Sequence, residues 1–66
     1  MNTVIHSYAG IDADGIPRVW GDGPTDAQAK AQCVWAIKEY CDSRLDIKPS
    51  EFSLFHFVGS VGATSP

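Results

Sequence analysis

The sequence predicts a small α+β domain, in which two strands, one helix and a third strand follow each other along the chain. Three observations predict this class. Residues 3–11 alternate in polarity as in a half-buried strand, residues 25–45 contain no Gly or Pro, and residues 52–58 are dense in aromatic and apolar side chains. A chain of 66 residues with 44% apolar and 20% charged residues fits one globular domain, expected at residues 1–58, with a flexible tail at 59–66.

A hairpin is expected to open the domain. Its strands are predicted at residues 3–11 and 16–20, joined by residues 12–15 (Asp-Ala-Asp-Gly), where the Asp-Gly pair suits the positive φ of a tight turn. Pro17 has no N–H to donate, so the second strand is expected at a sheet edge. Residues 21–24 (Gly-Asp-Gly-Pro) are predicted to end that strand.

The helix is predicted from Thr25 to Leu45. Thr25 and Gln28 have the spacing of a capping box, and Pro49 prevents the helix from continuing. At about 100° per residue, a set of apolar side chains gathers on one side of this helix. That set is Ala27, Ala31, Cys33, Val34, Ile37, Tyr40, Cys41 and Leu45.

The two cysteines are predicted to be reduced. Cys33 and Cys41 are eight residues apart in the helix, which separates their Cα atoms by about 12 Å at a rise of 1.5 Å per residue. A disulfide requires roughly 4.4–6.8 Å. His6 and His56 lie far from both cysteines in the sequence and no metal-ligand spacing recurs, so neither a metal nor another cofactor is expected.

The third strand, at residues 52–58, is expected beside the first. The order 3-1-2 keeps Pro17 at an edge, whereas the order 1-2-3 would place it in the central strand. A right-handed crossover then puts the helix on one face of the sheet and leaves the other face uncovered.

On the uncovered face we expect His6, Tyr8, Arg18, Trp20 and His56, and towards the helix Ile5, Ala9, Val19, Phe55 and Phe57. The register between the first and third strands stays open, and a slip by one residue would instead turn Leu54 and His56 towards the helix. Such an aromatic face suits a dimer interface or a binding surface. Tyr8, Arg18 and Trp20 are its candidate partner-binding residues.

Composition and motifs argue against several functions. The formal net charge is −3, from eight acidic and five basic side chains, which is unfavourable for direct binding of nucleic acid phosphates. No apolar run approaches the length of a membrane span and no signal-peptide pattern begins the chain, so a cytoplasmic protein is expected. No nucleophile elbow, phosphate loop or calcium loop is complete, so an enzyme is not expected.

Acidic side chains form the principal candidate site. On a helical wheel, each of three carboxylates that follow Trp35 falls within about 40° of it, opposite the apolar side. The end of the helix and the hairpin turn should lie at the same end of the molecule, which adds further carboxylates. Such an array could imitate DNA phosphates and occupy a basic groove. The candidate residues are Asp12, Asp14, Trp35, Glu39, Asp42, Asp46 and Glu51.

In its size, acidic charge, lack of catalytic motifs and β-β-α-β layout, the whole chain resembles the anti-CRISPR proteins of phages and mobile elements. Some members of that class act as DNA mimics on type I CRISPR complexes. The resemblance implies a non-enzymatic inhibitor in a bacterial host cell, whose partner is a basic nucleic-acid-binding complex such as a CRISPR surveillance complex. The sequence leaves both a monomer and a homodimer open.

A second resemblance is to HicB-type antitoxins. In that family an Asp-x-Asp-Gly hairpin, here residues 12–15, precedes a Gly-x-Thr-like helix start with alanines. The corresponding residues here are Gly23, Thr25, Ala27, Ala29 and Ala31. HicB-type proteins have an additional strand before the helix and usually a DNA-binding tail, and neither is predicted here. The antitoxin is therefore one alternative to the inhibitor, and a small dimeric protein-binding module that uses the uncovered aromatic face is the other.

Overall fold

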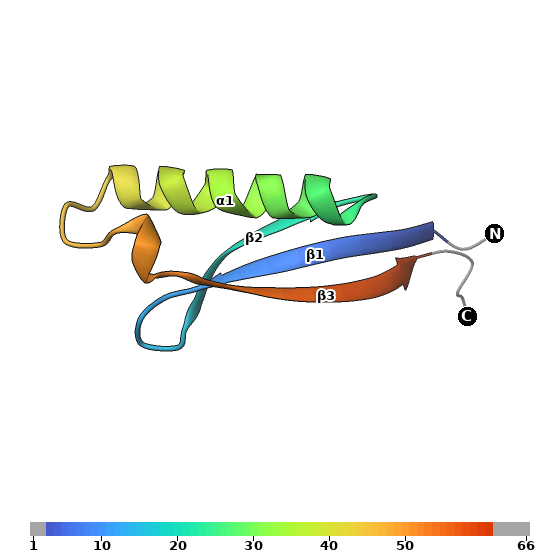
Figure 1. Ribbon diagram of the computed structural model, residues 1–66, viewed down its shortest axis with the longest axis horizontal. Helices are drawn as coiled ribbons and strands as arrows, with labels where there is room; N and C mark the ends of the chain where they lie inside the picture. Colours follow the sequence, from blue (N-terminus) through green and yellow to red (C-terminus); the bar gives the residue numbers. More distant parts are fainter. Residues whose placement is uncertain (1–2, 62–66) are drawn as a thin grey trace.

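The computed structural model describes residues 3–61, in which one helix lies along a three-stranded sheet (Figure 1). The elements are β1 (Thr3–Ile11), β2 (Pro17–Gly23), α1 (Asp26–Asp42), a 3₁₀ turn η1 (Pro49–Glu51) and β3 (Ser53–Val61). The strand order is β2-β1-β3, and the central β1 is antiparallel to both neighbours. The predicted α+β class, the β-β-α-β layout and the order 3-1-2 are confirmed.

The end of β2 and the end of α1 differ from the prediction. β2 continues beyond Trp20 to Gly23, because Gly21 and Gly23 remain paired with β1. α1 ends at Asp42 rather than Leu45, where a tightened turn is closed by the Arg44 N–H donating to the carbonyl of Cys41.

The end of β3 and the turn before it also depart from the prediction. β3 extends to Val61, so residues 59–61 of the expected tail belong to the strand. Residues 62–66 of that tail lie outside the described residues. The 3₁₀ turn η1 was not predicted, and it begins at Pro49, whose fixed φ suits the first position of a helical turn.

The start of α1 follows the prediction. Thr25 is the N-cap, and its Oγ1 accepts a hydrogen bond from the Gln28 N–H at 3.2 Å. The buried side of the helix differs from the wheel, however: Ala27, Ala31 and Val34 are exposed, and Leu45 lies beyond the helix. The side chains that α1 buries recur at every fourth position: Ala29, Cys33, Ile37 and Cys41.

The contact between α1 and β2 explains which side of the helix is buried. A Cβ atom built on Gly21 would lie 2.7 Å from the Ala29 carbonyl oxygen and 2.8 Å from the Cys33 Cα atom. Only a glycine permits the two backbones to approach this closely. The contact directs Ala29 and Cys33 onto the sheet and holds α1 over β2 and β1, with little contact to β3.

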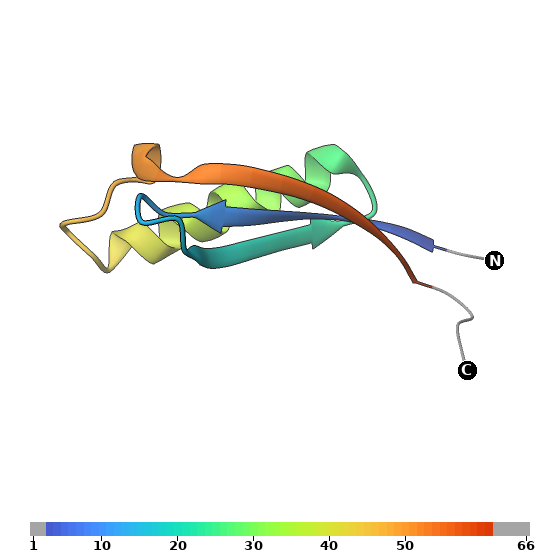
Figure 2. The same cartoon turned by 90° about the horizontal axis from the view of Figure 1, so that it is seen from below.

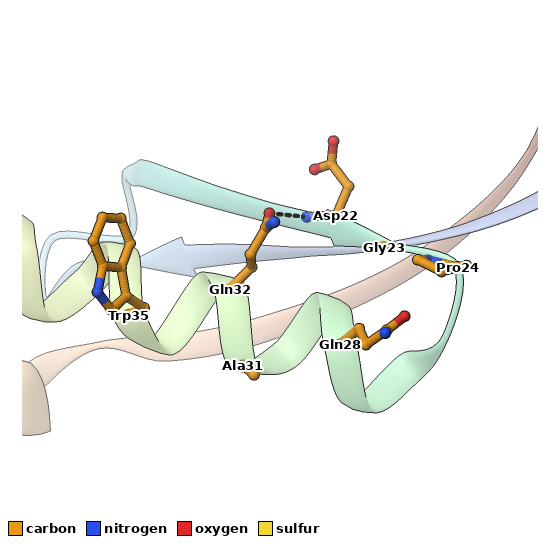
Figure 3. Close-up of a pocket in the computed structure, with 7 residues that line it drawn as sticks. All are labelled: Asp22, Gly23, Pro24, Gln28, Ala31, Gln32 and Trp35. Carbon is orange, nitrogen blue, oxygen red and sulfur yellow. Dashed lines mark hydrogen bonds between the residues drawn. The ribbon is translucent and has the colours of Figure 1, made fainter.

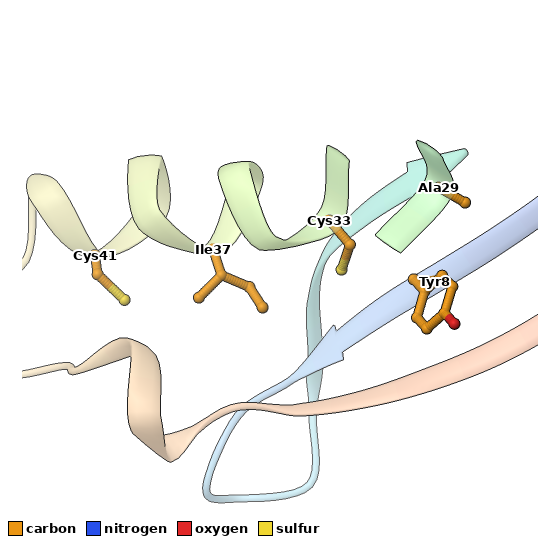
Figure 4. Packing of buried hydrophobic residues seen from close by; sticks show 5 residues of the cluster. All are labelled: Tyr8, Ala29, Cys33, Ile37 and Cys41. Atoms are coloured by element: carbon orange, nitrogen blue, oxygen red, sulfur yellow. The ribbon is translucent and has the colours of Figure 1, made fainter. Parts of the chain in front are cut away.

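The core is small and lies between α1 and the sheet (Figure 4). Cys33 and Cys41 are buried in it as free thiols, as predicted. Burial raises the pKa of both thiols, which makes them unreactive. The buried cluster consists of Tyr8, Ala29, Cys33, Ile37 and Cys41, with Val19, Tyr40, Ile47 and Phe52 packed around it.

The faces of β1 and β3 are the reverse of those predicted. Tyr8 is only 9% exposed and lies in the core beneath α1, and it pairs with Gly21 and His56. Opposed residues share a face, so His56 lies on the helix side. On β1, residues two apart share a face, so His6 lies there too. The expectation that His6 and Tyr8 project from the open face is therefore wrong, and of the two possibilities for β3 the structure has the one with Leu54 and His56 on the helix side.

Most of the residues that were expected to face the helix lie on the open face instead. Ala9 pairs with Trp20 and with Phe55, so these three share the open face, as do Ile5 and Phe57 by alternation. Trp20 on the open face and Val19 towards the helix agree with the prediction, and Arg18 lies at the register shift between β1 and β2, where it pairs with Asp12. The close approach of α1 is the physical reason, because it requires the face that carries Gly10 and Gly21 to lie under the helix.

Candidate protein-binding surface

The open face of the sheet carries three exposed aromatic side chains in neighbouring positions, which we call the aromatic face. Trp20 on β2 and Phe55 on β3 flank the buried Ala9 of β1 in one row of paired residues. Phe57 is two positions further along β3, with its ring centroid 5.8 Å from that of Phe55. The exposed fractions are 56% for Trp20, 57% for Phe55 and 43% for Phe57.

The aromatic face is rigidly built. Its side chains stand on three paired strands rather than on loops, and α1 lies on the opposite side of the sheet (Figures 1 and 2). Asp22 has the same strand parity as Trp20 and brings one carboxylate to the β2 border of this face. Exposed aromatic side chains grouped in this way are typical of protein interaction surfaces.

The carboxylates of the predicted DNA-like array are brought together only in part. The end of α1 and the β1–β2 turn do lie at the same end of the molecule (Figure 1), as expected. Glu39 and Asp42 are exposed on α1, and Asp14 is exposed in the turn. Asp46 leaves the predicted stripe because α1 stops at Asp42, and Glu51 lies in η1.

Asp12 is engaged in the turn. Its carboxylate accepts hydrogen bonds from the N–H groups of Asp14 at 2.9 Å and Ile16 at 3.0 Å, and from Arg18 Nε at 2.8 Å. The ion pair with Arg18, followed by the Ile16 N–H, lowers the pKa of Asp12. Asp12 and Arg18 therefore neutralise each other, and both side chains are already occupied within the protein.

Trp35 is 63% exposed on the outer side of α1, one helical turn before the exposed Glu39. On one side the exposed side chains of Ala31, Val34 and Lys38 adjoin it. On the other side is an open hollow of about 490 Å³ between α1 and the end of β2 (Figure 3). Its lining residues are Asp22, Gly23, Pro24, Gln28, Ala31, Gln32 and Trp35. Gln32 Oε1 accepts from the Asp22 N–H at 3.2 Å, so these polar groups already bind each other.

A polar cluster fastens the start of α1 to the sheet; the sequence placed His6, Tyr8 and His56 on one face, and their contact with Asp26 was not predicted. The His56 ring stacks on Tyr8 with centroids 4.7 Å apart and on His6 with centroids 5.4 Å apart. Tyr8 donates its hydroxyl hydrogen to Asp26, and His56 Nε2 lies 3.9 Å from the same carboxylate oxygen. The Tyr8–Asp26 hydrogen bond raises the pKa of Tyr8 and lowers the pKa of Asp26.

This polar cluster has the features of a structural contact rather than a metal centre. The imidazole rings of His6 and His56 are nearly parallel, at 9°, and His6 Nδ1 lies at hydrogen-bond distance, 3.2 Å, from His56 Nε2. Within residues 3–61, no three His, Cys, Asp or Glu side chains are placed to hold a metal ion. The shared parity of His6 and Tyr8 was visible in the sequence, but the reversed face assignment placed both residues away from α1 and therefore away from Asp26.

Asp12 and Asp26 both form hydrogen bonds in the folded chain, so we expect the stability of the protein to fall in acid. The pKa of Asp12 and that of Asp26 are both lowered by folding, so below about pH 4 the unfolded chain takes up protons first. The urea midpoint should be constant above about pH 5 and should decrease progressively below it. Asp12→Asn should lower the midpoint at neutral pH and reduce this decrease. A wild-type midpoint that is the same at pH 3 as at pH 6 would contradict the prediction.

Comparisons with known proteins did not identify a relative of this chain. No protein-family model matches the chain, and neither a curated protein nor a solved structure is significantly similar to it. The helix of the described residues lacks the length and apolar character that crossing a bilayer requires. The fold and the surface thus define a small α+β domain with an uncovered aromatic face.

Proposed function

We propose that this chain is a non-enzymatic protein-binding module that recognises a partner protein through the aromatic face of its sheet. The observation that carries this proposal is the exposure of Trp20, Phe55 and Phe57 on the side that α1 does not cover. Tryptophan is among the residues most enriched at binding hot spots, and aromatic side chains fixed on strands lose little conformational freedom on binding.

The free energy that burial of the aromatic face would contribute supports a binding role. Burying the exposed half of one aromatic side chain contributes about 2–3 kcal/mol at 25 cal/mol per Å². The three side chains together contribute about 7 kcal/mol. This gain is comparable with the estimated free-energy cost of bringing two proteins together. The aromatic face therefore provides the centre of an interface, and contacts at its borders must add the remaining affinity.

The acidic end of the molecule favours a second function, inhibition of a basic nucleic-acid-binding complex by DNA mimicry. Glu39 and Asp42 are exposed and take part in neither of the two ion pairs found within residues 3–61. Arg44 and Lys48 lie in the segment that follows, however, and Asp12 is already neutralised. The charge array is thus weaker than the sequence predicted, and the aromatic face is the better supported surface.

Affinity capture with three forms of the chain separates these functions. The forms are wild type, an aromatic-face variant (Trp20→Ser with Phe55→Ser) and a carboxylate variant (Glu39→Gln, Asp42→Asn and Asp46→Asn). All replaced side chains are exposed, so circular dichroism should show that each form is folded. We expect wild type and the carboxylate variant to capture the same protein from a host lysate, in low and in high salt, and the aromatic-face variant to lose it.

The other outcomes identify the alternatives. Loss of the captured protein with the carboxylate variant, together with capture only at low salt, would support DNA mimicry and the anti-CRISPR resemblance instead. If the captured protein is a small ribonuclease toxin, the antitoxin alternative is favoured. Equal capture by all three forms would reject both surfaces.

A further inference from the structure

The two edges of the sheet differ in their protection against pairing with another strand. β2, at one edge, carries Pro17, Arg18 and Asp22, and proline and charged residues are the usual means of blocking edge pairing. β3, at the other edge, has nine residues, Ser53–Val61, none of which is charged or proline. Within residues 3–61 no strand pairs with its outer side.

Both faces of β3 are also uncovered. Phe55 and Phe57 are exposed on the open side, and Leu54 and Val58 are exposed on the helix side. α1 packs on β2 and β1 and has little contact with β3. A strand added at this edge would therefore meet apolar side chains on both faces.

We propose that β3 pairs in antiparallel fashion with β3 of a second copy of this chain, forming one continuous sheet with a two-fold axis at Phe57. In that register Phe57 faces its own copy, and Phe55 lies opposite Gly59 of the copy. A Cβ atom on Gly59 would have no other atom within 4 Å, so there is open space to receive the Phe55 ring. Aromatic residues paired with glycine across strands are a known stabilising device.

Charge also favours this arrangement. Each copy has a net charge of −3, and the contact strand itself carries none. Antiparallel pairing places Glu51, just before β3, beside the far end of the other strand. The two Glu51 residues are then twelve residues apart along the strand direction, about 40 Å at about 3.4 Å per residue, well beyond the Debye length of about 8 Å at physiological salt. A parallel pairing would place them side by side.

The dimer does not depend on the proposed partner binding, and it would join the two aromatic faces into one larger surface. It is therefore tested on the purified chain alone. Sedimentation equilibrium from micromolar to millimolar concentration should show wild type moving from the monomer mass of 7.1 kDa towards twice that mass. Gly59→Lys should weaken association by about tenfold or more, because it fills the space for Phe55 and adds like charges.

Two further variants make the result specific. Ala31→Lys adds the same charge on the exposed side of α1 and should leave the dimer unchanged. Phe57→Cys should form a disulfide-linked dimer on mild oxidation, because directly opposed residues of antiparallel strands have Cα atoms about 4.5–5.5 Å apart. A wild-type chain that stays monomeric, or a dimer that neither Gly59→Lys weakens nor Phe57→Cys cross-links, would overturn the proposal. Either failure would leave the capture result standing.

Discussion

Gly21→Ala should lower the free energy of unfolding by about 3 kcal/mol or more, which is a large part of the stability of a chain this short. The added methyl group would meet the Ala29 carbonyl oxygen at 2.7 Å and the Cys33 Cα atom at 2.8 Å. Both are backbone atoms of α1, so the clash is relieved only by moving the helix away from β2. Urea denaturation followed by circular dichroism measures the loss.

Gly10→Ala is the matched comparison for that substitution. Gly10 lies on the same face of the neighbouring strand, but its Cβ atom would meet side-chain atoms, Val19 Cγ2 at 2.7 Å and Ile37 Cγ1 at 2.9 Å. Side chains can change rotamer, so we expect a smaller loss, about 1–2 kcal/mol. If Gly21→Ala is as stable as wild type, or more stable than Gly10→Ala, the close approach of α1 to β2 is not as described.

Trp20→Ala should weaken binding to the captured partner by about 30-fold or more, the effect typical of a hot-spot tryptophan. Trp20 lies on the edge strand β2 in the same row as Ala9 and Phe55, and it carries the largest side chain of the aromatic face. Its ring is more than half exposed, so the free energy of unfolding should change by less than about 1 kcal/mol. Calorimetric titration of the purified partner, with thermal unfolding of each variant, measures both quantities.

Trp35→Ala is the control, because Trp35 is the same residue type with a similar exposed fraction on the opposite side of the molecule. We expect its affinity to stay within about threefold of wild type, as for most residues outside a hot spot. The reverse order of effects, with Trp35→Ala the weaker binder, would place the interface on α1. The carboxylates Glu39, Asp42 and Asp46 would then be the better candidate for the partner-binding surface.

Local signals in the sequence were sufficient for much of the fold. The capping box at Thr25 located the start of α1, and Pro17 correctly placed β2 at an edge. The end of α1 was misplaced because apolar residues continue to Leu45, while the Cys41 carbonyl closes a tighter turn that no residue pattern announces. That error moved Asp46 into a helical stripe to which it does not belong.

The candidate surface was harder to predict because β1 has apolar side chains of both parities. Ile5 and Ile11 lie on one face of β1, and Val4 and Tyr8 lie on the other. The alternation of apolar residues alone therefore could not decide which face lies under α1. The deciding information is the position of small residues, since Gly10 and Gly21 share the face that α1 approaches closely. Trp20 was nevertheless placed correctly, whereas Phe55 and Phe57 depended on a register between distant strands.

The chain has two tryptophans, and this allows the role of the aromatic face to be measured directly. Trp35→Phe leaves Trp20 as the single fluorescent tryptophan, and Trp20→Phe leaves Trp35. Acrylamide quenching of each variant is compared in the free chain and with saturating partner. We predict that the partner protects Trp20 from quenching and leaves Trp35 as accessible as in the free chain. Protection of Trp35 while Trp20 remains fully quenched would contradict the assignment of the aromatic face as the binding surface.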